Sequence, residues 1–168
     1  MLGFITIQDG SGAADRFLAE TADALQAQGL RLAGAVRSDL DRIGMQDCDM
    51  ELRVLGDGAR IRISQDLGSG AQACRLDPGA LASAAGRAEA VLAQGADLVI
   101  VNKFGKQEGL GQGFRAVIAA AVAQGVPVLT TVAPEHLPAF RDFAGDMAEP
   151  VPAEAALDWC RAQALPAR

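Results

Sequence analysis

Two glycine-rich loops carry the residues best suited to chemistry. The first, Asp9-Gly10-Ser11-Gly12, follows a short apolar run, and the second, Asn102-Lys103-Phe104-Gly105-Lys106-Gln107-Glu108, follows the most apolar run of the chain. Glycines let backbone N–H groups surround an anion, and the start of a following helix adds partial positive charge. Lys103 and Lys106 are the only lysines in the sequence, and the other 13 basic residues are arginines. Two compact ammonium charges in one loop predict that they neutralise an oxyanion held by the first loop.

The first loop lacks the residues that hydrolysis needs. A catalytic phosphate-binding loop ends in Gly-Lys-Ser/Thr, where the lysine bridges the terminal phosphates and the hydroxyl holds magnesium. Ala13 and Ala14 stand at those positions, and Asn102 stands where a metal-binding acid is expected. We therefore expect binding without hydrolysis, no metal site and no assigned catalytic residue. The predicted ligand-binding residues are Gly10, Ser11, Gly12, Asn102, Lys103, Lys106, Glu108 and Arg75.

Each of these features also has a purely structural interpretation. The first loop is compatible with a tight turn, and the second with a solvated surface loop. Glu108 is expected either to pair with one of the two lysines or to act as a base. The arginines at 53, 60 and 62 suit phosphate, molybdate or carboxylate, but also an exposed hairpin face. Arg75 lies in an otherwise apolar stretch, so we expect it to be buried and paired. His136 follows Pro134-Glu135 and is expected to cap a helix or lie on the surface.

Alternating apolar runs and helical patterns predict a single α/β domain over residues 1–168. Strands are expected at 3–7, 30–36, 96–101 and 126–132, and helices at 13–28, 77–94, 113–124, 137–143 and 153–164. Residues 50–55 and 59–64 alternate around Gly56-Asp57-Gly58, which predicts a β-hairpin insertion at about 49–65. Ligands of such sheets bind at the carboxyl ends of the strands, where both glycine loops lie.

Composition excludes several classes of protein. The chain has 168 residues, a net charge of −6 and a pI near 4.7, which argues against nucleic-acid binding. Three irregularly spaced cysteines and one histidine argue against a disulfide framework or a zinc site. The N-terminus has no basic region or cleavage site, and no apolar run reaches the roughly 18 residues of a membrane span. We expect a cytoplasmic chain, with its oligomeric state left open.

Four segments resemble an uncharacterised bacterial family often encoded near molybdenum genes. They are Cys48-Asp49-Met50-Glu51-Leu52-Arg53, Arg62-Ile63-Ser64-Gln65-Asp66-Leu67-Gly68, Cys74-Arg75-Leu76-Asp77 and Asn102-Lys103-Phe104-Gly105-Lys106-Gln107-Glu108-Gly109. The resemblance covers nearly the whole chain and implies a role in molybdenum handling.

The chain is also distantly similar to the small P-loop nucleoside triphosphatases. Gly10 and Gly12 match glycines of their phosphate loop, and Gly105 and Glu108 match a later Asp-Glu-Ile-Gly-x-Met-Glu motif whose two acids are replaced by Asn102 and Lys103. This likeness implies a P-loop-NTPase-like three-layer sandwich with a mostly parallel sheet and a hairpin insertion. The differences fall on the catalytic positions.

Three functions follow as hypotheses. The first is a degenerate P-loop-like domain that binds a small anion, such as molybdate, tungstate or phosphate, or a nucleotide. The second is an active nucleoside triphosphatase that uses Lys103 or Lys106 in place of the missing lysine. The third is an interaction or chaperone domain for a molybdenum transporter or enzyme. No cofactor is assigned, and the partner is either a small ligand, a second copy of the chain or another protein.

Overall fold

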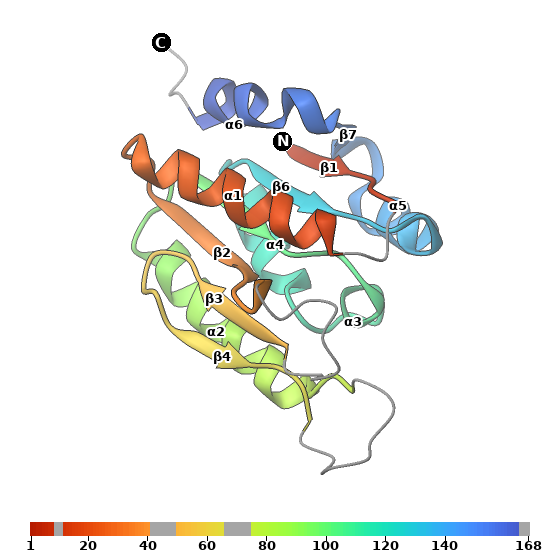
Figure 1. The fold of residues 1–168 in the computed structure, drawn as a ribbon. Coiled ribbons are helices and arrows are strands. Elements are labelled where there is room, and N and C mark those ends of the chain that lie inside the picture. Colours follow the sequence, from red (N-terminus) through yellow and green to blue (C-terminus); the bar gives the residue numbers. More distant parts are fainter. Residues whose placement is uncertain (9–11, 41–49, 66–74, 165–168) are drawn as a thin grey trace.

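A seven-stranded sheet runs through the molecule in the order β4-β3-β2-β5-β6-β1-β7 (Figure 1). The computed structural model describes residues 1–8, 12–40, 50–65 and 75–164. The strands are β1 (Leu2–Ile5), β2 (Leu32–Arg37), β3 (Glu51–Val54), β4 (Arg60–Arg62), β5 (Leu98–Val101), β6 (Val128–Thr131) and β7 (Ala148–Pro150). Strands β2, β5, β6, β1 and β7 are parallel to one another. Strand β3 pairs antiparallel with β2, and β4 pairs antiparallel with β3. The predicted mostly parallel sheet is confirmed.

Helices cover both faces of the sheet and complete three layers. The helices are α1 (Ala13–Ala27), α2 (Pro78–Ala93), α3 (Lys106–Gly109), α4 (Arg115–Ala123), α5 (Leu137–Ala144) and α6 (Ala156–Ala164), with short 3-10 turns η2 (Pro134–His136), η3 (Gly145–Met147) and η4 (Ala153–Ala155). One apolar core joins α2, α4 and α5 to the sheet, and a second joins α1 and α6 to its opposite face. The structure therefore has the predicted P-loop-like α/β sandwich architecture.

The hairpin insertion extends the sheet beyond β2. Leu52 and Val54 of β3 are buried, as is Ile63 just after β4, whereas Arg60 and Arg62 are exposed, as the alternation predicted. Arg53 is partly buried and donates to Asp23 of α1 at 2.6 Å. Because the apolar side chains of the hairpin face α2, they form one wall of the space at the end of β2 and β5.

Local signals set the helix that supports this wall. Asp77 is the N-cap of α2, and its Oδ1 accepts hydrogen bonds from the backbone N–H groups of Gly79 and Ala80 at 3.0 and 3.1 Å. Pro78 occupies the first helical position, where its missing N–H is not needed. The predicted start of this helix is confirmed.

Two elements were absent from the sequence prediction. The one-turn helix α3 lies between the predicted strand at 96–101 and the predicted helix at 113–124, and Glu108 caps its start from within the same turn. Strand β7 pairs with β1 at the edge of the sheet and contains Pro150, which an edge strand tolerates. Neither segment carries a periodic apolar pattern that would have revealed it.

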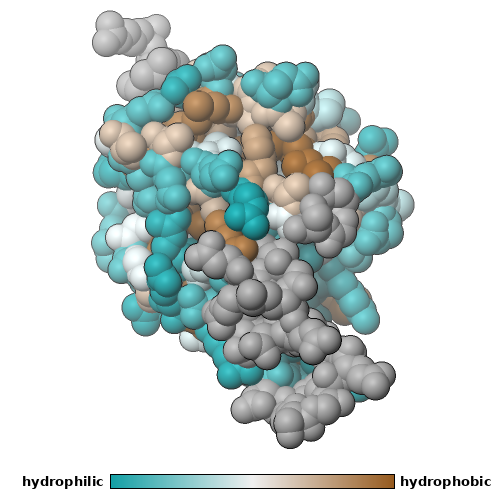
Figure 2. Space-filling model, viewed as in Figure 1, coloured by the Kyte–Doolittle hydropathy of each residue, from teal (hydrophilic) through white to brown (hydrophobic). Residues whose placement is uncertain are grey.

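The surface seen from the side of α1 is mostly hydrophilic, and hydrophobic side chains reach it in the upper part of the view, around β1 and α6 (Figure 2). Ile7, Phe17 and Trp159 are among the partly buried apolar residues packed on the core of that side. Across the described ranges, no helix is long and apolar enough to cross a membrane.

Candidate functional site

A cavity of about 590 Å³ lies where β2 and β5 end and the hairpin begins. Its walls come from the start of α1, the end of β2, the hairpin, the segment before α2, the loop after β5, and α3. The lining residues are Asp15, Arg37, Met50, Leu52, Ile63, Gln65, Arg75, Leu76, Leu81, Asn102, Lys103, Gly105, Lys106, Gln107, Glu108, Phe114 and His136. The cavity is thus at the strand ends where ligands of such sheets bind.

The segment 102–108, here called the lysine loop, contains a strained residue, Lys103, whose two neighbours are hydrogen-bonded to different strands. The N–H of Asn102 donates to Ala35 of β2 at 2.9 Å, and the N–H of Phe104 donates to Thr131 of β6 at 3.0 Å. Between them, Lys103 has a φ of 128°. Among the described residues it is the only non-glycine residue with a positive φ. Such a conformation costs about 1–3 kcal/mol and persists only where its surroundings impose it.

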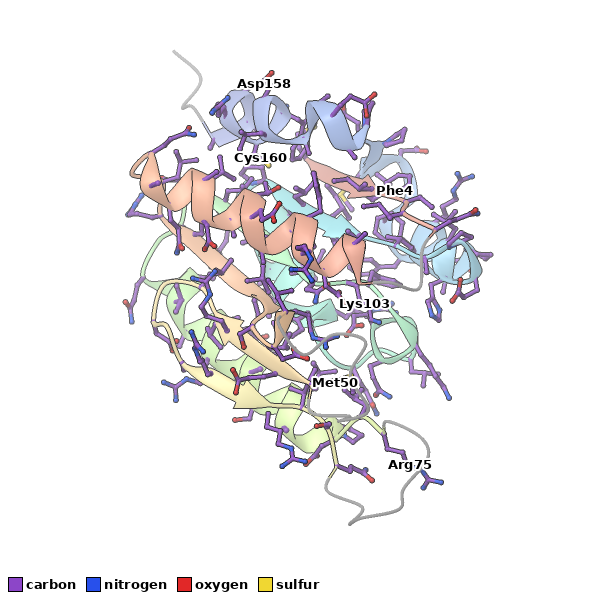
Figure 3. The ribbon with its side chains drawn as sticks, viewed as in Figure 1. Phe4, Met50, Arg75, Lys103, Asp158 and Cys160 are labelled. Carbon is purple, nitrogen blue, oxygen red and sulfur yellow. The ribbon has the colours of Figure 1, made fainter. Side chains whose placement is uncertain are left out.

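Phe104 imposes that conformation by its burial. Its ring is fully buried, lies 5.2 Å edge-on from the ring of Phe140 and stacks at 5.5 Å on the ring of Phe143. Because Phe104 points into this aromatic cluster, the neighbouring Lys103 side chain is left exposed at the cavity. Figure 3 shows Lys103 below α1, on the side of the hairpin where Met50 lies.

Asn102 presents an unsatisfied acceptor at the same place. Its Oδ1 is buried and has no hydrogen-bond partner, and it is unique in this respect among the side-chain atoms that the structure describes. A buried acceptor without a partner costs about 1–3 kcal/mol. Asn102 also lines the cavity, so a bound ligand is one source of the missing donor.

Glu108 anchors the lysine loop through hydrogen bonds from two backbone N–H groups. Its Oε1 accepts from the N–H of Gly105 at 2.9 Å, and its Oε2 accepts from the N–H of Phe114 at 3.1 Å. Burial raises the pKa of Glu108, against the lowering effects of these backbone hydrogen bonds and of the Lys103 charge. Gly113 has a φ of +60°, and a Cβ there would lie 1.8 Å from Oε2. Glu108 therefore lines the cavity with a carboxylate already occupied by backbone donors.

An ion-pair network closes the side of the cavity next to α1. The Arg37 Nε donates to Asp39 Oδ1 at 2.6 Å, and Arg37 Nη1 lies 3.3 Å from Asp15 Oδ2. Burial by itself lowers the pKa of Arg37. The hydrogen bond to Asp39 and the charges of both aspartates raise it by more, so the net shift of this pKa is upward. Burial by itself raises the pKa of Asp39. The hydrogen bond from Arg37, together with other hydrogen bonds and the Arg37 charge, lowers it by more, so the net shift of this pKa is downward. Arg37 is thus a permanently charged, neutralised group.

The two lysines differ from Arg37 in forming no salt bridge within the described residues, although the Lys103 charge acts on the Glu108 carboxyl. Across the described ranges neither the Lys103 nor the Lys106 ammonium takes part in an ion pair or hydrogen bond, and both side chains are exposed. Among the described residues that line the cavity, four side chains are cationic and two are acidic, a formal charge of +2, whereas the whole chain has a net charge of −6. The described part of the cavity wall is therefore positive on an acidic protein.

The predicted residues assemble only in part. Asn102, Lys103, Lys106 and Glu108 line one cavity. Gly12 caps the start of α1 with a φ of 80°, whereas Gly10 and Ser11 lie outside the described residues.

The prediction that Arg75 is buried and paired is wrong. Arg75 lines the edge of the cavity but is exposed, and no ion pair of its side chain occurs within the described ranges. Figure 3 shows it near the outer end of the segment before α2, with its side chain directed away from the body of the protein. The reason is geometric: residues 63–65 pair with residues 75–77, which leaves Arg75 at the end of this ladder.

Sequence reasoning did not place Asp15, Arg37 or His136 at a ligand site. Asp15 and Arg37 are 22 residues apart and meet only through packing. His136, expected to cap a helix or lie on the surface, occupies the N-cap position of α5 without a side-chain capping bond, is partly buried and lines the cavity. No local pattern marks any of them, although Arg37 immediately follows an apolar run.

Comparison with known proteins places the chain in a family. Residues 4–159 match the family described as a protein of unknown function, DUF2478. The chain belongs to the DUF2478 family. It is also 40% identical, in an alignment of 136 residues that covers 78% of the chain, to the molybdenum import ATP-binding protein ModC 2 of Bradyrhizobium diazoefficiens. No solved structure is significantly similar.

The DUF2478 chain spans only 15% of the length of this ModC 2 protein. The name of that relative describes a much longer protein, so its ATP-binding role does not transfer to the matched segment by identity alone. The printed name of that relative refers to molybdenum import, the setting that the family resemblance implied.

Proposed function

We propose that this DUF2478 chain is a P-loop-like binding domain that holds a small anion at the lysine loop and does not hydrolyse nucleotides. One observation carries the proposal: the cavity brings Lys103 and Lys106, which form no salt bridge within the described residues, to the end of β5. Charged hydrogen bonds to an anion contribute about 1.5–3 kcal/mol each, so this arrangement favours an anionic ligand.

The sequence of α1 supports binding rather than catalysis. Helix α1 begins at Ala13, directly after the Gly12 cap, so the positions of the phosphate-bridging lysine and the magnesium-binding hydroxyl carry methyl groups. Phosphoryl transfer depends almost entirely on positioned charge, and losing these groups removes most of it. Lys103 lies after β5, on a different element, and supplies charge to a bound anion without restoring a magnesium ligand.

The biological setting that we propose is molybdenum transport. The similarity to a molybdenum import ATP-binding protein supports it, and the small share of that protein that matches favours an accessory domain over the transporter ATPase itself. Candidate ligands are molybdate, tungstate, phosphate and a nucleotide, and the candidate partner is a transporter protein.

The test is a titration of the purified chain with phosphate, molybdate, tungstate and ATP, with and without magnesium. A ligand at 100 times its Kd stabilises the fold by about 2.7 kcal/mol, which raises the Tm by about 5–10 °C. The double variant Lys103→Ala/Lys106→Ala should weaken binding at least about tenfold. The matched control Arg87→Ala/Arg161→Ala removes two exposed charges elsewhere, each paired only at the surface, and should keep wild-type affinity.

Two results would count against the proposal. Absence of any anion-induced shift would remove the binding function and leave the interaction domain as the remaining hypothesis. Magnesium-dependent release of phosphate from ATP that disappears in Lys103→Ala would identify an active nucleoside triphosphatase instead.

A further inference from the structure

The cavity is larger than a bare oxyanion requires. A tetrahedral oxyanion has four oxygens, and at about 30 Å³ for each water-sized oxygen it fills about 120 Å³. The cavity measures about 590 Å³, within the range of about 300–1,000 Å³ typical of sites for organic ligands. A ligand that fits this space has a body several times larger than the anionic group alone.

The chemistry of the walls divides the cavity in two. The lysine loop and α3 supply polar and cationic groups, whereas the hairpin, the start of α2 with the segment before it, and the residue before α4 supply apolar side chains. These side chains, here called the apolar wall, are Met50, Leu52, Ile63, Leu76, Leu81 and Phe114. A hydrated dianion gains nothing from an apolar wall, since burying charge beside hydrocarbon carries a desolvation cost. An uncharged ring does gain, in proportion to the apolar area removed from water.

The Asn102 acceptor adds a third requirement. Its buried Oδ1 needs a donor, and a fully deprotonated oxyanion such as molybdate offers only acceptors. A ring N–H or amino group offers the donor. Gln65 and Gln107 also line the cavity and can hydrogen-bond the edge of such a ring.

We infer that the ligand is an organic phosphate or carboxylate whose body is a flat heterocycle bearing an N–H donor. The anionic group lies at Lys103 and Lys106, the ring lies against the apolar wall, and its N–H donates to Asn102. This inference rests on the proposed anion-binding function and specifies its ligand class. A nucleoside monophosphate and a phosphorylated non-nucleoside ring share this chemistry.

The experiment divides the ligand into its parts. Isothermal titration compares GMP with guanosine, which lacks the anion, and with ribose 5-phosphate, which lacks the heterocycle. Pyridoxine 5′-phosphate, a phosphorylated pyridine ring, represents the non-nucleoside source and is compared with pyridoxine. Phosphate and molybdate are the bare anions. We expect one of the two phosphorylated rings to bind at least 100-fold tighter than phosphate or molybdate, and at least tenfold tighter than its own unphosphorylated ring. Whichever of the two binds tighter identifies the source.

Variants on each wall should separate the two contributions. Leu76 is partly buried, so Leu76→Gln makes the wall polar with little change in volume, and Leu76→Met is the matched apolar control. Leu76→Gln should weaken the phosphorylated ring at least fivefold and leave ribose 5-phosphate unchanged, and Leu76→Met should change neither. If Leu76→Gln does not fold, Met50→Gln on the same wall replaces it.

The outcomes distinguish this inference from the proposed function. Molybdate or phosphate binding as tightly as either phosphorylated ring, with loss of affinity in the lysine variant, would overturn the organic ligand and keep the anion-binding domain. Ring binding that Leu76→Gln leaves unchanged would also overturn the placement against the apolar wall. Absence of binding by every probe would overturn both.

Discussion

Glu108 offers the most quantitative test of how the lysine loop is held. Both of its carboxylate oxygens accept backbone hydrogen bonds, from Gly105 at 2.9 Å and from Phe114 at 3.1 Å, and the side chain is 4% exposed. Glu108→Ala would leave both backbone N–H groups without their acceptor. Glu108→Gln keeps the shape but retains a single acceptor oxygen, because the amide NH₂ would face one of the two N–H donors.

The magnitude follows from the two lost acceptors. Each buried N–H without a partner costs about 1–3 kcal/mol. Removing a buried charge offsets part of this cost, so we expect Glu108→Ala to lower the free energy of unfolding by about 3 kcal/mol. At about 2–4 °C per kcal/mol for a chain of this size, the Tm should fall by about 6–12 °C. Glu108→Gln should fall between the wild type and the alanine variant.

Urea unfolding at pH 7 measures both variants, with Glu89→Ala as the control. Glu89 is exposed on α2, so its removal should change stability by less than about 0.5 kcal/mol. A Glu108→Ala variant as stable as this control would refute the anchoring role. It would also free the Glu108 carboxylate for the ligand-binding or base role that the sequence predicted.

The pH dependence of stability supplies a second readout of Glu108. Burial raises the pKa of Glu108 in the folded state above the ordinary 4.5. At a pH between 4.5 and the folded-state pKa, the folded protein therefore holds a proton that the unfolded chain has released. The contribution of Glu108 to stability is therefore largest below pH 4.5 and falls as pH rises through the folded pKa. Glu108→Gln should lack this fall, and identical pH profiles of the two proteins would contradict the upward shift.

Three further variants test the strain and packing around the site. Lys103→Gly should raise the Tm, because glycine relieves a φ of 128° that costs about 1–3 kcal/mol, and should weaken anion binding in the same preparation; a lower Tm would show that Lys103 is not strained. Gly113→Ala should destabilise at least about 1 kcal/mol more than Gly125→Ala in urea unfolding, since both have positive φ but only Gly113 would place a Cβ 1.8 Å from Glu108, and equal costs would contradict this contact. Asp77→Ala should cost about 1 kcal/mol through loss of the α2 cap, measured by the urea midpoint, and no change would refute the capping hydrogen bonds.

Local patterns in the sequence determined most of the fold. The apolar runs before each glycine loop predicted β1 and β5, the alternation at 50–64 predicted the hairpin, and Asp77-Pro78 predicted the start of α2. These features depend on side-chain periodicity and on backbone groups within one or two turns. They are therefore readable without knowledge of the tertiary structure.

The meeting of the lysine loop with the end of β2 was also predictable in outline. Parallel strands end at one edge of a sheet, so residues following β5 had to lie near residues following β2. The positions of Asn102, Lys103 and Lys106 at one cavity agree with this rule.

Only the tertiary structure decided what each side chain does there. Glu108 is an anchor because Phe114 and Gly105 donate to it. Arg37 gains a second counter-ion, beside the nearby Asp39, because Asp15 approaches from another element, and Arg75 is exposed because its ladder ends at the surface. Lys103 is strained because its neighbours are tied to two different strands. These outcomes depend on contacts between elements that are distant in sequence. The amino-acid pattern of one segment does not indicate which other segment will pack against it.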